Sequence, residues 1–396
     1  MEINTDDSMV TRFYSANNNF PFWVSSKKNI KKATEWLAVI DSSKNFGMAV
    51  NHLQINQIRV ALINIKAASE KIKAQTDQQI TALVLNFLKE FQEGNIHFDY
   101  DEVYANRDSV YIQQLLKSKS QVYVSKMVDR LECKDEEYRV LKNFMNDSIT
   151  SQDTLKFKSV IRAINYRKYL TVNHQPEFIL VNIPETMVRY YRNDLLTLEM
   201  RAVVGRKKFQ TPTIASHIIN IVTFPYWNVP HSIAVKEILP KVKKDEAYLE
   251  QNNYEVVDSK GVEIDDANLI WENYTEKNFP YFFRQSTGTE NALGVLKFNL
   301  QNPFSIFLHS TSLQSGFKKD FRFLSHGCIR LENPIELAND LLRGKLDMIE
   351  LKEGKENTKS GKIALPDKIQ VFLIYSTAIV VDKKVTFLPD VYGLIN

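Results

Sequence analysis

The chain has 396 residues, 44% of them hydrophobic and 25% charged, which is typical of a globular protein with two or three domains. Its 51 Lys and Arg against 47 Asp and Glu give a net charge of +4, too small and too dispersed to indicate a nucleic-acid-binding protein. Its two cysteines form no CxxC pair, so they exclude a disulfide framework and argue against a structural zinc site.

The N-terminus carries no sign of an export signal. Residues 1–13 contain neither the basic segment nor the apolar stretch of a secretory signal peptide. No apolar run along the chain approaches the roughly 20 residues that cross a bilayer, so no transmembrane segment is expected. The chain is therefore either cytoplasmic or a mature protein from which the export signal has been removed.

Residues 1–165 are predicted to form a helical domain. In the clearest helix, residues 76–94, apolar side chains recur with the i, i+3, i+4, i+7 spacing. Thr76 and Gln79 would form a capping box at its start, and Gly94 would end it. Weaker helical periodicity covers residues 29–40, 55–71, 111–117, 120–131, 136–145 and 154–170.

Residues 166–396 are predicted to form a mainly β domain. Stretches rich in β-branched and aromatic residues begin at residue 177, and Asn193-Asp194 between two of them indicates a tight hairpin turn. The last strands are expected within residues 365–396. The predicted strands cover residues 177–183, 187–192, 195–205, 218–224, 294–300, 304–309, 370–375 and 378–381.

An insertion interrupts this series of strands at residues 228–283. Residues 232–244 have a helical pattern, whereas residues 245–280 are polar and irregular. An insertion of this length in a sheet domain is a candidate lid or substrate-binding flap. The overall prediction is an α+β fold with a helical domain, a mainly β domain and an inserted lid.

The segment with the strongest chemical signal is residues 304–342, which contain His309 and Cys328. A thiol nucleophile needs a base such as imidazole, and it needs backbone N–H groups directed at the developing oxyanion. Gly327 directly before Cys328 permits the sharp turn that would expose both the sulfur and those amides. A structural role is the common alternative for such residues, and it is the preferred interpretation for Cys133, which lies in a helical stretch.

A helix is predicted directly after the cysteine loop. Asn333 would cap it, Pro334 would be its first residue, Glu336 would close a capping box, and Gly344 would end it. Such a helix would hold the cysteine loop rigidly.

The signature formed by His309, fifteen intervening residues and Ser325-His326-Gly327-Cys328-Ile329-Arg330 resembles the active site of the L,D-transpeptidases with a YkuD-like catalytic domain. The stretches at residues 179–193, 203–216, 225–242 and 291–298 are similar to the large, multi-domain, YcbB-like periplasmic branch of that family. The resemblance implies an N-terminal helical scaffold domain followed by a mainly β YkuD-like catalytic domain with an inserted lid.

The resemblance also implies roles for the residues of the signature. Cys328 would be the nucleophile that forms a thioester, and His309 would be the general base that activates the thiol. The Cys328 amide, helped by the backbone around Gly327 and His326, would form the oxyanion hole.

Each of five further residues has two alternative roles. Ser310 and Ser325 would orient the imidazole or the cysteine loop, or serve the structure alone. Arg330 would pair with a carboxylate of the donor or brace the loop through its fixed set of donors. Tyr226 and Trp227 would begin a substrate-covering lid or pack in the core at its hinge.

The activity implied by the resemblance is peptidoglycan cross-linking. A donor tetrapeptide stem would lose its terminal D-Ala, and an amine of an acceptor stem would attack the thioester to give a 3→3 cross-link. No metal or organic cofactor is implied, the location would be periplasmic or in the cell envelope, and carbapenems would acylate the thiol. Envelope proteins would bind through the helical domain.

Three alternatives remain open at this point. Water as the acceptor would make the protein an L,D-carboxypeptidase. A catalytically idle scaffold that binds the cell wall is a second possibility. The third is a zinc site that uses His309, His326, Cys328 and His231.

Overall fold

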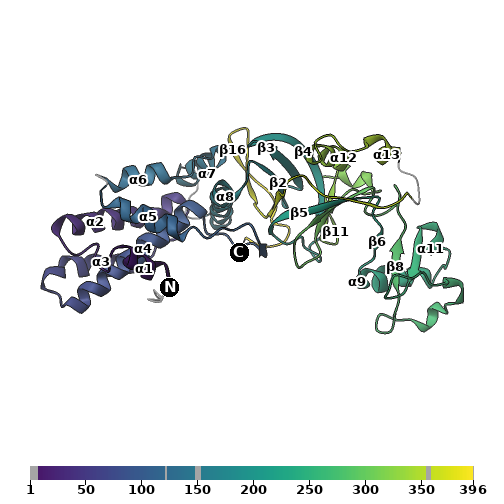
Figure 1. The fold of residues 1–396 in the computed structure, drawn as a ribbon, viewed down its shortest axis with the longest axis horizontal. Helices are drawn as coiled ribbons and strands as arrows, with labels where there is room; N and C mark the ends of the chain where they lie inside the picture. Colours follow the sequence, from purple (N-terminus) through teal and green to yellow (C-terminus); the bar gives the residue numbers. More distant parts are fainter. Residues whose placement is uncertain (1–7, 121–122, 148–152, 354–357, 396) are drawn as a thin grey trace. The chain divides into compact units, whose positions relative to one another are not determined.

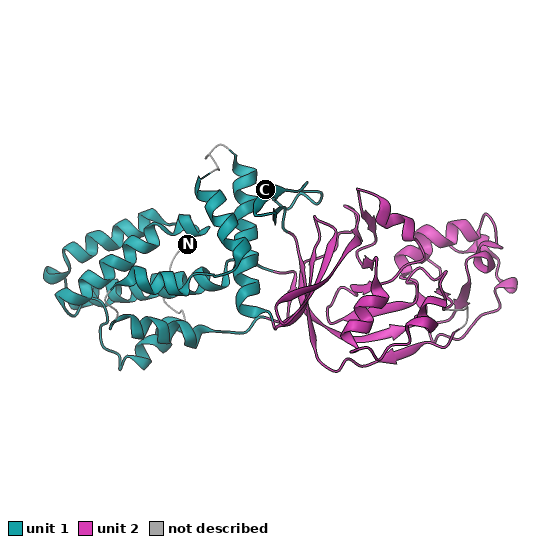
Figure 2. Ribbon diagram, turned by 90° about the horizontal axis from the view of Figure 1, so that it is seen from above, with its two compact units in different colours: residues 1–97, 104–174, 376–396 teal, residues 98–103, 175–375 magenta. Residues whose placement is uncertain are grey.

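The structure is a computed structural model that describes residues 8–120, 123–147, 153–353 and 358–395. It divides into two compact units (Figure 1, Figure 2). The helical unit comprises residues 1–97, 104–174 and 376–396, and the sheet unit comprises residues 98–103 and 175–375. The sequence predicts no export signal in residues 1–13, and residues 1–7 of that stretch lie outside the described residues.

The helical unit is built from α-helices along the first part of the chain. They are α1 (Ser8–Ala16), α2 (Lys27–Asp41), α3 (His52–Ile63), α4 (Glu70–Glu93), α5 (Asp108–Ser118), α6 (Val124–Leu131), α7 (Glu136–Asp147) and α8 (Thr154–Asn173). Residues 121–122, at the start of the helix predicted from residue 120, lie outside the described part. No helix among the described residues combines the length and the apolar character required to cross a membrane.

Helix α4 begins earlier than the sequence pattern predicted. The hydroxyl of Ser69 accepts the N–H of Ile72 and caps the helix, so Thr76 lies inside α4 as a buried residue and the predicted capping box at Thr76 is wrong. The predicted end is correct, because Gly94 follows the helix with a φ of +74° that favours glycine.

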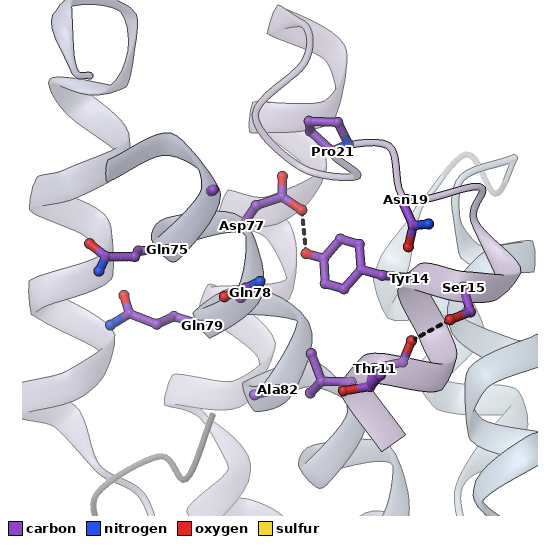
Figure 3. Close-up of a pocket in the computed structure, with 12 residues that line it drawn as sticks. Thr11, Tyr14, Ser15, Asn19, Pro21, Gln75, Asp77, Gln78, Gln79 and Ala82 are labelled. Atoms are coloured by element: carbon purple, nitrogen blue, oxygen red, sulfur yellow. Dashed lines mark hydrogen bonds between the residues drawn. The ribbon is translucent and has the colours of Figure 1, made fainter. Parts of the chain in front are cut away.

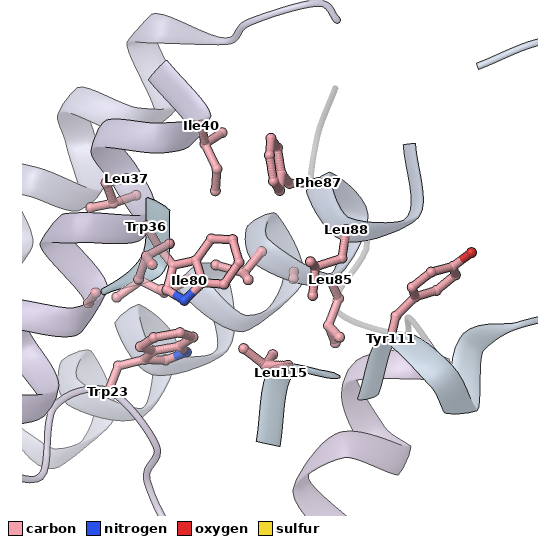
Figure 4. Close-up of a cluster of buried hydrophobic side chains, with 14 of the residues drawn as sticks. Trp23, Trp36, Leu37, Ile40, Ile80, Leu85, Phe87, Leu88, Tyr111 and Leu115 are labelled. Atoms are coloured by element: carbon pink, nitrogen blue, oxygen red, sulfur yellow. The ribbon is translucent and has the colours of Figure 1, made fainter. Parts of the chain in front are cut away.

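The core of the helical unit lies where α2, α4 and α5 pack against one another. Large aromatic and branched side chains from these helices interlock with Trp23 from the preceding loop (Figure 4). Trp23, Trp36, Ile80 and Leu115 are fully buried. Burial of apolar surface on this scale drives the folding of the unit, at about 1.5–3 kcal/mol for each large side chain.

The compact units divide at a different place from the predicted domains. Helix α8 continues across the predicted boundary at residues 165/166 because its later turns are buried through Tyr166, Tyr169 and Leu170. The C-terminal hairpin of β15 (Ala378–Val381) and β16 (Lys384–Phe387) also belongs to the helical unit. Its apolar side chains share a core cluster with residues of α7 and α8.

The main sheet of the sheet unit closes on itself. Its strand order is β1-β5-β14-β2-β3-β4-β12-β10-β9, and β5 also pairs with β9, while β11 and β13 attach to β4 and β5. The turn predicted at Asn193-Asp194 is present, with positive φ angles at both residues. The strands are β1 (Tyr100–Asp101), β2 (Glu177–Asn182), β3 (Met187–Arg192), β4 (Leu195–Gly205), β5 (Ile214–Thr223), β9 (Leu296–Leu300), β10 (Phe307–His309), β11 (Phe323–Ser325), β12 (Ile329–Leu331), β13 (Gly361–Ile363) and β14 (Ile369–Ile374).

The insertion at residues 228–283, here called the lid, has a core of its own. A small sheet in the order β6-β8-β7 packs with short helices around Trp271, Phe279 and Phe283. Its sheet and first helical turns are β6 (Trp227–Asn228), β7 (Tyr254–Val257), β8 (Phe282–Gln285), α9 (His231–Ile233), the π-helical turn Ala234–Ile238 and α10 (Leu239–Val242). The segment predicted to be irregular also contains α11 (Tyr248–Gln251).

The π-helical turn in the lid has a local cause. Pro240 lies at the second position of α10, where it cannot donate an N–H and where, in a regular α-helix, its ring would clash with the carbonyl one turn earlier. Widening the preceding turn accommodates that ring. The same turn carries Glu237, which extends toward the cysteine loop, as described below.

Candidate active site

A cavity of about 720 Å³ in the sheet unit gathers most of the predicted site residues. It lies where the ends of β10 and β12 meet the beginning of the lid. The predicted residues that line it are Tyr226, Trp227, His309, Ser325, His326, Cys328 and Arg330. Ser310 and Gly327 are outside the lining and act on the site through the backbone.

Hydrogen bonds hold the cysteine loop in a sharp turn between β11 and β12. Gly327 has a φ of +117°, and a Cβ there would approach Ile306 to 3.2 Å, so glycine suits the position. The hydroxyl of Ser325 donates to the Cys328 carbonyl at 2.6 Å and accepts the Gly327 N–H at 3.1 Å. Thr211, which the sequence analysis missed, donates to the Gly327 carbonyl at 2.7 Å.

This arrangement changes the predicted oxyanion hole. The Gly327 N–H is already bound by Ser325, so it is not free to stabilise an oxyanion. The Cys328 N–H has no hydrogen-bond partner among the described residues. Ser325 therefore orients the loop, and the Cys328 amide remains the available donor.

The Cys328 thiol is half-buried and protonated at neutral pH. Its sulfur lies 3.7 Å from the Ser305 carbonyl, which accepts the S–H. Burial raises the pKa of Cys328 to about 11, although a hydrogen bond from the Phe307 backbone and the charges of Lys297 and Arg330 favour the thiolate. A base is therefore required to activate this thiol.

His309 ends β10 and is buried. Its Nδ1 lies 2.5 Å from the Ser310 carbonyl, so Nδ1 carries the proton and Nε2 is left with a lone pair. Burial together with the charges of Arg330 and Lys297 lowers the pKa of His309 to about 3. The imidazole is neutral at physiological pH and has the form that a general base needs.

The Ser310 hydroxyl has a structural partner rather than the imidazole. It donates to the Leu293 carbonyl at 2.9 Å and accepts the Leu296 N–H at 2.9 Å. Gly294 closes this turn with a φ of +61°, and a Cβ there would lie 2.3 Å from the hydroxyl. Ser310 thus contributes to the orientation of His309 only through its carbonyl.

His326 faces the lid instead of the thiol. Its Nε2 lies 2.7 Å from Oε1 of Glu237 and 2.5 Å from Nη2 of Arg206. Arg206 also donates to Glu237 at 3.1 Å, and its guanidinium stacks over the Phe209 ring. The sequence analysis missed Glu237 and Arg206, because neither belongs to the signature around Cys328.

Tyr226 and Trp227 lie where the chain enters the insertion. Trp227 begins β6 and pairs with Gln285 of β8, so it anchors one end of the small sheet. Tyr226 is exposed, with the Arg284 guanidinium 5.2 Å from its ring centroid. Both side chains line the cavity.

The helix after the cysteine loop is α12 (Pro334–Leu341), and its capping differs from the prediction. Pro334 is the first helical residue, as predicted, but the Asn333 side chain makes no capping hydrogen bond. A capping box needs that bond, so the predicted box is wrong, and Glu336 instead lies 3.9 Å from Lys352 of α13 (Met348–Glu353). Gly344 follows the helix end with a φ of +76°.

Cys133 lies in the connection between α6 and α7 rather than in a helix. It is buried, and its sulfur lies 3.3 Å from the Thr171 hydroxyl. Burial raises the pKa of Cys133, so this thiol is protonated and shielded.

Within the part of the chain that the structure describes, no three His, Cys, Asp or Glu side chains converge so as to hold a metal ion. His309 binds a backbone carbonyl and His326 binds Glu237, so the predicted zinc ligands are directed at different partners. The zinc alternative therefore gains no support from the geometry.

The helical unit has a cavity of about 540 Å³ between α1 and α4 (Figure 3). Among the described residues that line it, the only charged one is Asp77, which accepts the Tyr14 hydroxyl at 2.5 Å and the N–H groups of Phe22, Trp23 and Val24. The chain itself satisfies this carboxylate. Asp77 therefore stabilises the loop after α1 and does not form a catalytic group.

Two family models match the chain. Residues 176–351 match the L,D-transpeptidase catalytic domain (YkuD), and residues 8–145 match the Scaffold domain. These matches confirm the predicted α+β fold with a helical region before a mainly β domain.

A Haemophilus influenzae protein named as an L,D-transpeptidase is 35% identical over 257 residues, which cover 62% of this chain and 51% of that protein. The chain thus spans about half the length of the curated relative it matches.

Solved structures give weaker similarity. An L,D-transpeptidase from Mycobacterium smegmatis is 13% identical, with 50% of this chain and 58% of that chain covered and a TM-score of 0.25. The catalytic domain of an E. faecium L,D-transpeptidase acylated by ertapenem is 12% identical, with 48% and 98% covered and a TM-score of 0.23.

Proposed function

Because this chain combines a Scaffold domain with a YkuD-type L,D-transpeptidase catalytic domain, we propose that its sheet unit is a cysteine acyltransferase that cross-links peptidoglycan stem peptides. The observation that carries the proposal is the presence of Cys328 and the neutral, oriented His309 in one cavity. A thiol, a base and a free backbone amide in one cavity are the groups that acyl transfer requires.

The first half-reaction forms a thioester. The Cys328 sulfur attacks the carbonyl carbon of the third residue of a tetrapeptide stem, and Nε2 of His309 takes the thiol proton. The oxyanion of the tetrahedral intermediate accepts the Cys328 N–H. When the C–N bond to the terminal D-Ala breaks, His309 returns the proton to the leaving amine.

The second half-reaction transfers the acyl group. A side-chain amine of another stem attacks the thioester carbonyl, and His309 accepts its proton. The C–S bond then breaks, the sulfur takes the proton back, and a 3→3 cross-link is released. Water in place of the amine would leave a trimmed stem, so the acceptor alone separates transpeptidase from carboxypeptidase activity.

This chemistry needs no metal or organic cofactor, because the side chains and backbone of the cavity supply every proton transfer. The substrate lies outside the cytoplasm, so the proposal places the protein in the periplasm or cell envelope. The helical unit would then be available for envelope protein partners.

The decisive test is incubation of the purified chain with a defined tetrapeptide muropeptide, followed by product analysis by mass spectrometry. The proposal predicts release of D-Ala and a dimer cross-linked between two third residues. Cys328→Ala should abolish both products. Loss of D-Ala without dimer would identify a carboxypeptidase, and no product from a folded wild-type protein would contradict the proposal in favour of an idle scaffold.

A further inference from the structure

Lys297, His309 and Arg330 form a row across three neighbouring strands. In the register of the sheet, His309 of β10 pairs with Lys297 of β9 on one side and with Arg330 of β12 on the other. Directly opposed residues of adjacent strands project from the same face, and all three side chains line the cavity. The imidazole is therefore flanked by two cations.

Neither cation is neutralised by the protein. Among the described residues, no ion pair involves Lys297 or Arg330, and the buried Nε of Arg330 has no hydrogen-bond partner. The Lys297 ammonium lies 4.1 Å from the centroid of the Phe307 ring, a contact that orients it without cancelling its charge.

Among the described residues, the lining of the cavity contains no free carboxylate. Glu237 is the only acidic residue of that lining, and its carboxylate already accepts hydrogen bonds from His326 and Arg206. Two cations held in a partly desolvated cavity without a counter-charge are costly, so the site is matched to an anion from outside the protein.

We propose that Lys297 and Arg330 together bind a carboxylate of the acyl donor close to its scissile carbonyl, and that Lys297 makes the enzyme select donors in which this group is ionised. The inference rests on the proposed function and specifies its substrate class. Arg330 supplies a planar set of N–H donors suited to a carboxylate, and Lys297 supplies a point charge from the neighbouring strand.

The position of the subsite links binding to catalysis. In the free protein, burial and the two cations lower the pKa of His309, which weakens the imidazole as a base. A carboxylate bound between Lys297 and Arg330 offsets their field and strengthens the base when the donor is in place. The donor thus completes the charge balance of the site.

The bound group is the carboxylate of the terminal D-Ala or, in a stem whose third residue is acidic, the side-chain carboxylate of that residue, and amidation of each in turn shows which one is bound. Three donors would be compared: the free acid, the same peptide amidated at its terminal D-Ala, and the same peptide amidated at the side chain of its third residue. One of the two amides should lower kcat/KM by roughly tenfold to hundredfold, the loss expected for one charge-assisted hydrogen bond. The other amide should react like the free acid.

Variants test whether Lys297 causes this preference. Lys297→Met should remove most of the discrimination between the free acid and the sensitive amide, and Lys297→Arg should restore it. Lys362→Met, at an exposed lysine of β13, is the matched control and should discriminate like the wild type. An unchanged preference in Lys297→Met, an equal loss in Lys362→Met, or equal turnover of all three donors by the wild type would overturn the proposal.

A binding measurement separates this proposal from the proposed function. In a Cys328→Ala background, calorimetry should show that the free-acid stem binds more tightly than the sensitive amide, and that Lys297→Met abolishes the difference. If the wild type turned over no donor while this binding difference persisted, the proposed function would fail and the subsite would stand. If turnover occurred without a binding difference, the subsite would fail alone.

Discussion

Oε1 of Glu237, in the lid, lies 2.7 Å from Nε2 of His326, in the loop that carries the cysteine two residues later. Arg206 donates to the same Glu237 oxygen, and its Nη2 lies 2.5 Å from Nε2 of His326, so the three side chains form one cluster between the insertion and the cysteine loop. Partial burial opposes ionisation of Glu237, but hydrogen bonds to His326 and Arg206 outweigh it and lower its pKa. The carboxylate is charged at neutral pH and ties the lid to the cysteine loop.

Removing the charge of Glu237 should loosen the lid. Glu237→Gln keeps the shape of the side chain but weakens its bonds to His326 and Arg206, by about 1 kcal/mol or less because the Glu237 and Arg206 side chains are each 41% exposed. Donor kcat/KM should fall severalfold, and amide hydrogen exchange in Ala234–Ile238 should accelerate. Glu250→Gln, at an exposed position of α11 in the same lid, should change neither. Unchanged exchange in Glu237→Gln would rule out the tie.

Excising the lid should leave a folded but slow enzyme. Asn228 of β6 pairs with Arg284 of β8, so a two-residue Asn-Gly turn can replace residues 229–283 and keep that pair as a hairpin. The lid has its own core, so the main sheet should survive. Acyl transfer should fall by about a hundredfold or more, since water exclusion and donor positioning are lost. Near-wild-type turnover with an intact circular dichroism spectrum would mean that the insertion is dispensable.

His309→Gln should greatly reduce acylation without unfolding the protein. Glutamine can retain the bond to the Ser310 carbonyl but cannot take the thiol proton, so the acylation rate should drop by about 10²–10⁴-fold. Stopped-flow acylation and thermal unfolding would be measured together. His231→Gln, at an exposed residue of the lid, is the matched control. If acylation were unaffected in His309→Gln, another group would activate the thiol, and His326 would be examined next.

Alkylation of Cys328 by iodoacetamide should increase with pH. Burial raises the pKa of this thiol to about 11, so the thiolate fraction rises about tenfold for each pH unit below that value. The labelling rate should climb steadily between pH 7 and pH 10. A preformed thiolate–imidazolium pair would instead give a plateau in this range, and that result would contradict the protonated Cys328 thiol and the neutral His309 imidazole described above.

A carbapenem should acylate Cys328 and spare Cys133. The strained amide of the drug resembles an activated donor, and only Cys328 has a base and a free amide in its cavity. Cys133 is buried, burial raises its pKa, and its neighbour is the Thr171 hydroxyl. Intact-protein mass spectrometry should show one adduct, which peptide mapping places on Cys328 and which Cys328→Ser abolishes. An adduct on Cys133 would refute the assignment of the nucleophile.

Local sequence determined much of this protein. Helical periodicity identified most of the described helices of the first 165 residues but missed α1, and Asn193-Asp194 identified a turn whose two positive φ angles suit those residues. The signature from His309 to Arg330 predicted an L,D-transpeptidase catalytic domain, and the match of residues 176–351 to the model of that domain agrees with the prediction. These features depend on residues close together in the chain, where spacing and residue type carry the physical information.

Only the tertiary structure decided the surroundings of the nucleophile. Lys297 and Arg330 flank His309 through the pairing of three strands, and Glu237 reaches His326 from 89 residues away. The return of residues 376–396 to the helical unit has the same origin, since their apolar side chains complete a core formed by α7 and α8. No short-range pattern encodes such contacts, because strand register and the pairing of buried charges depend on the free energy of the whole folded chain.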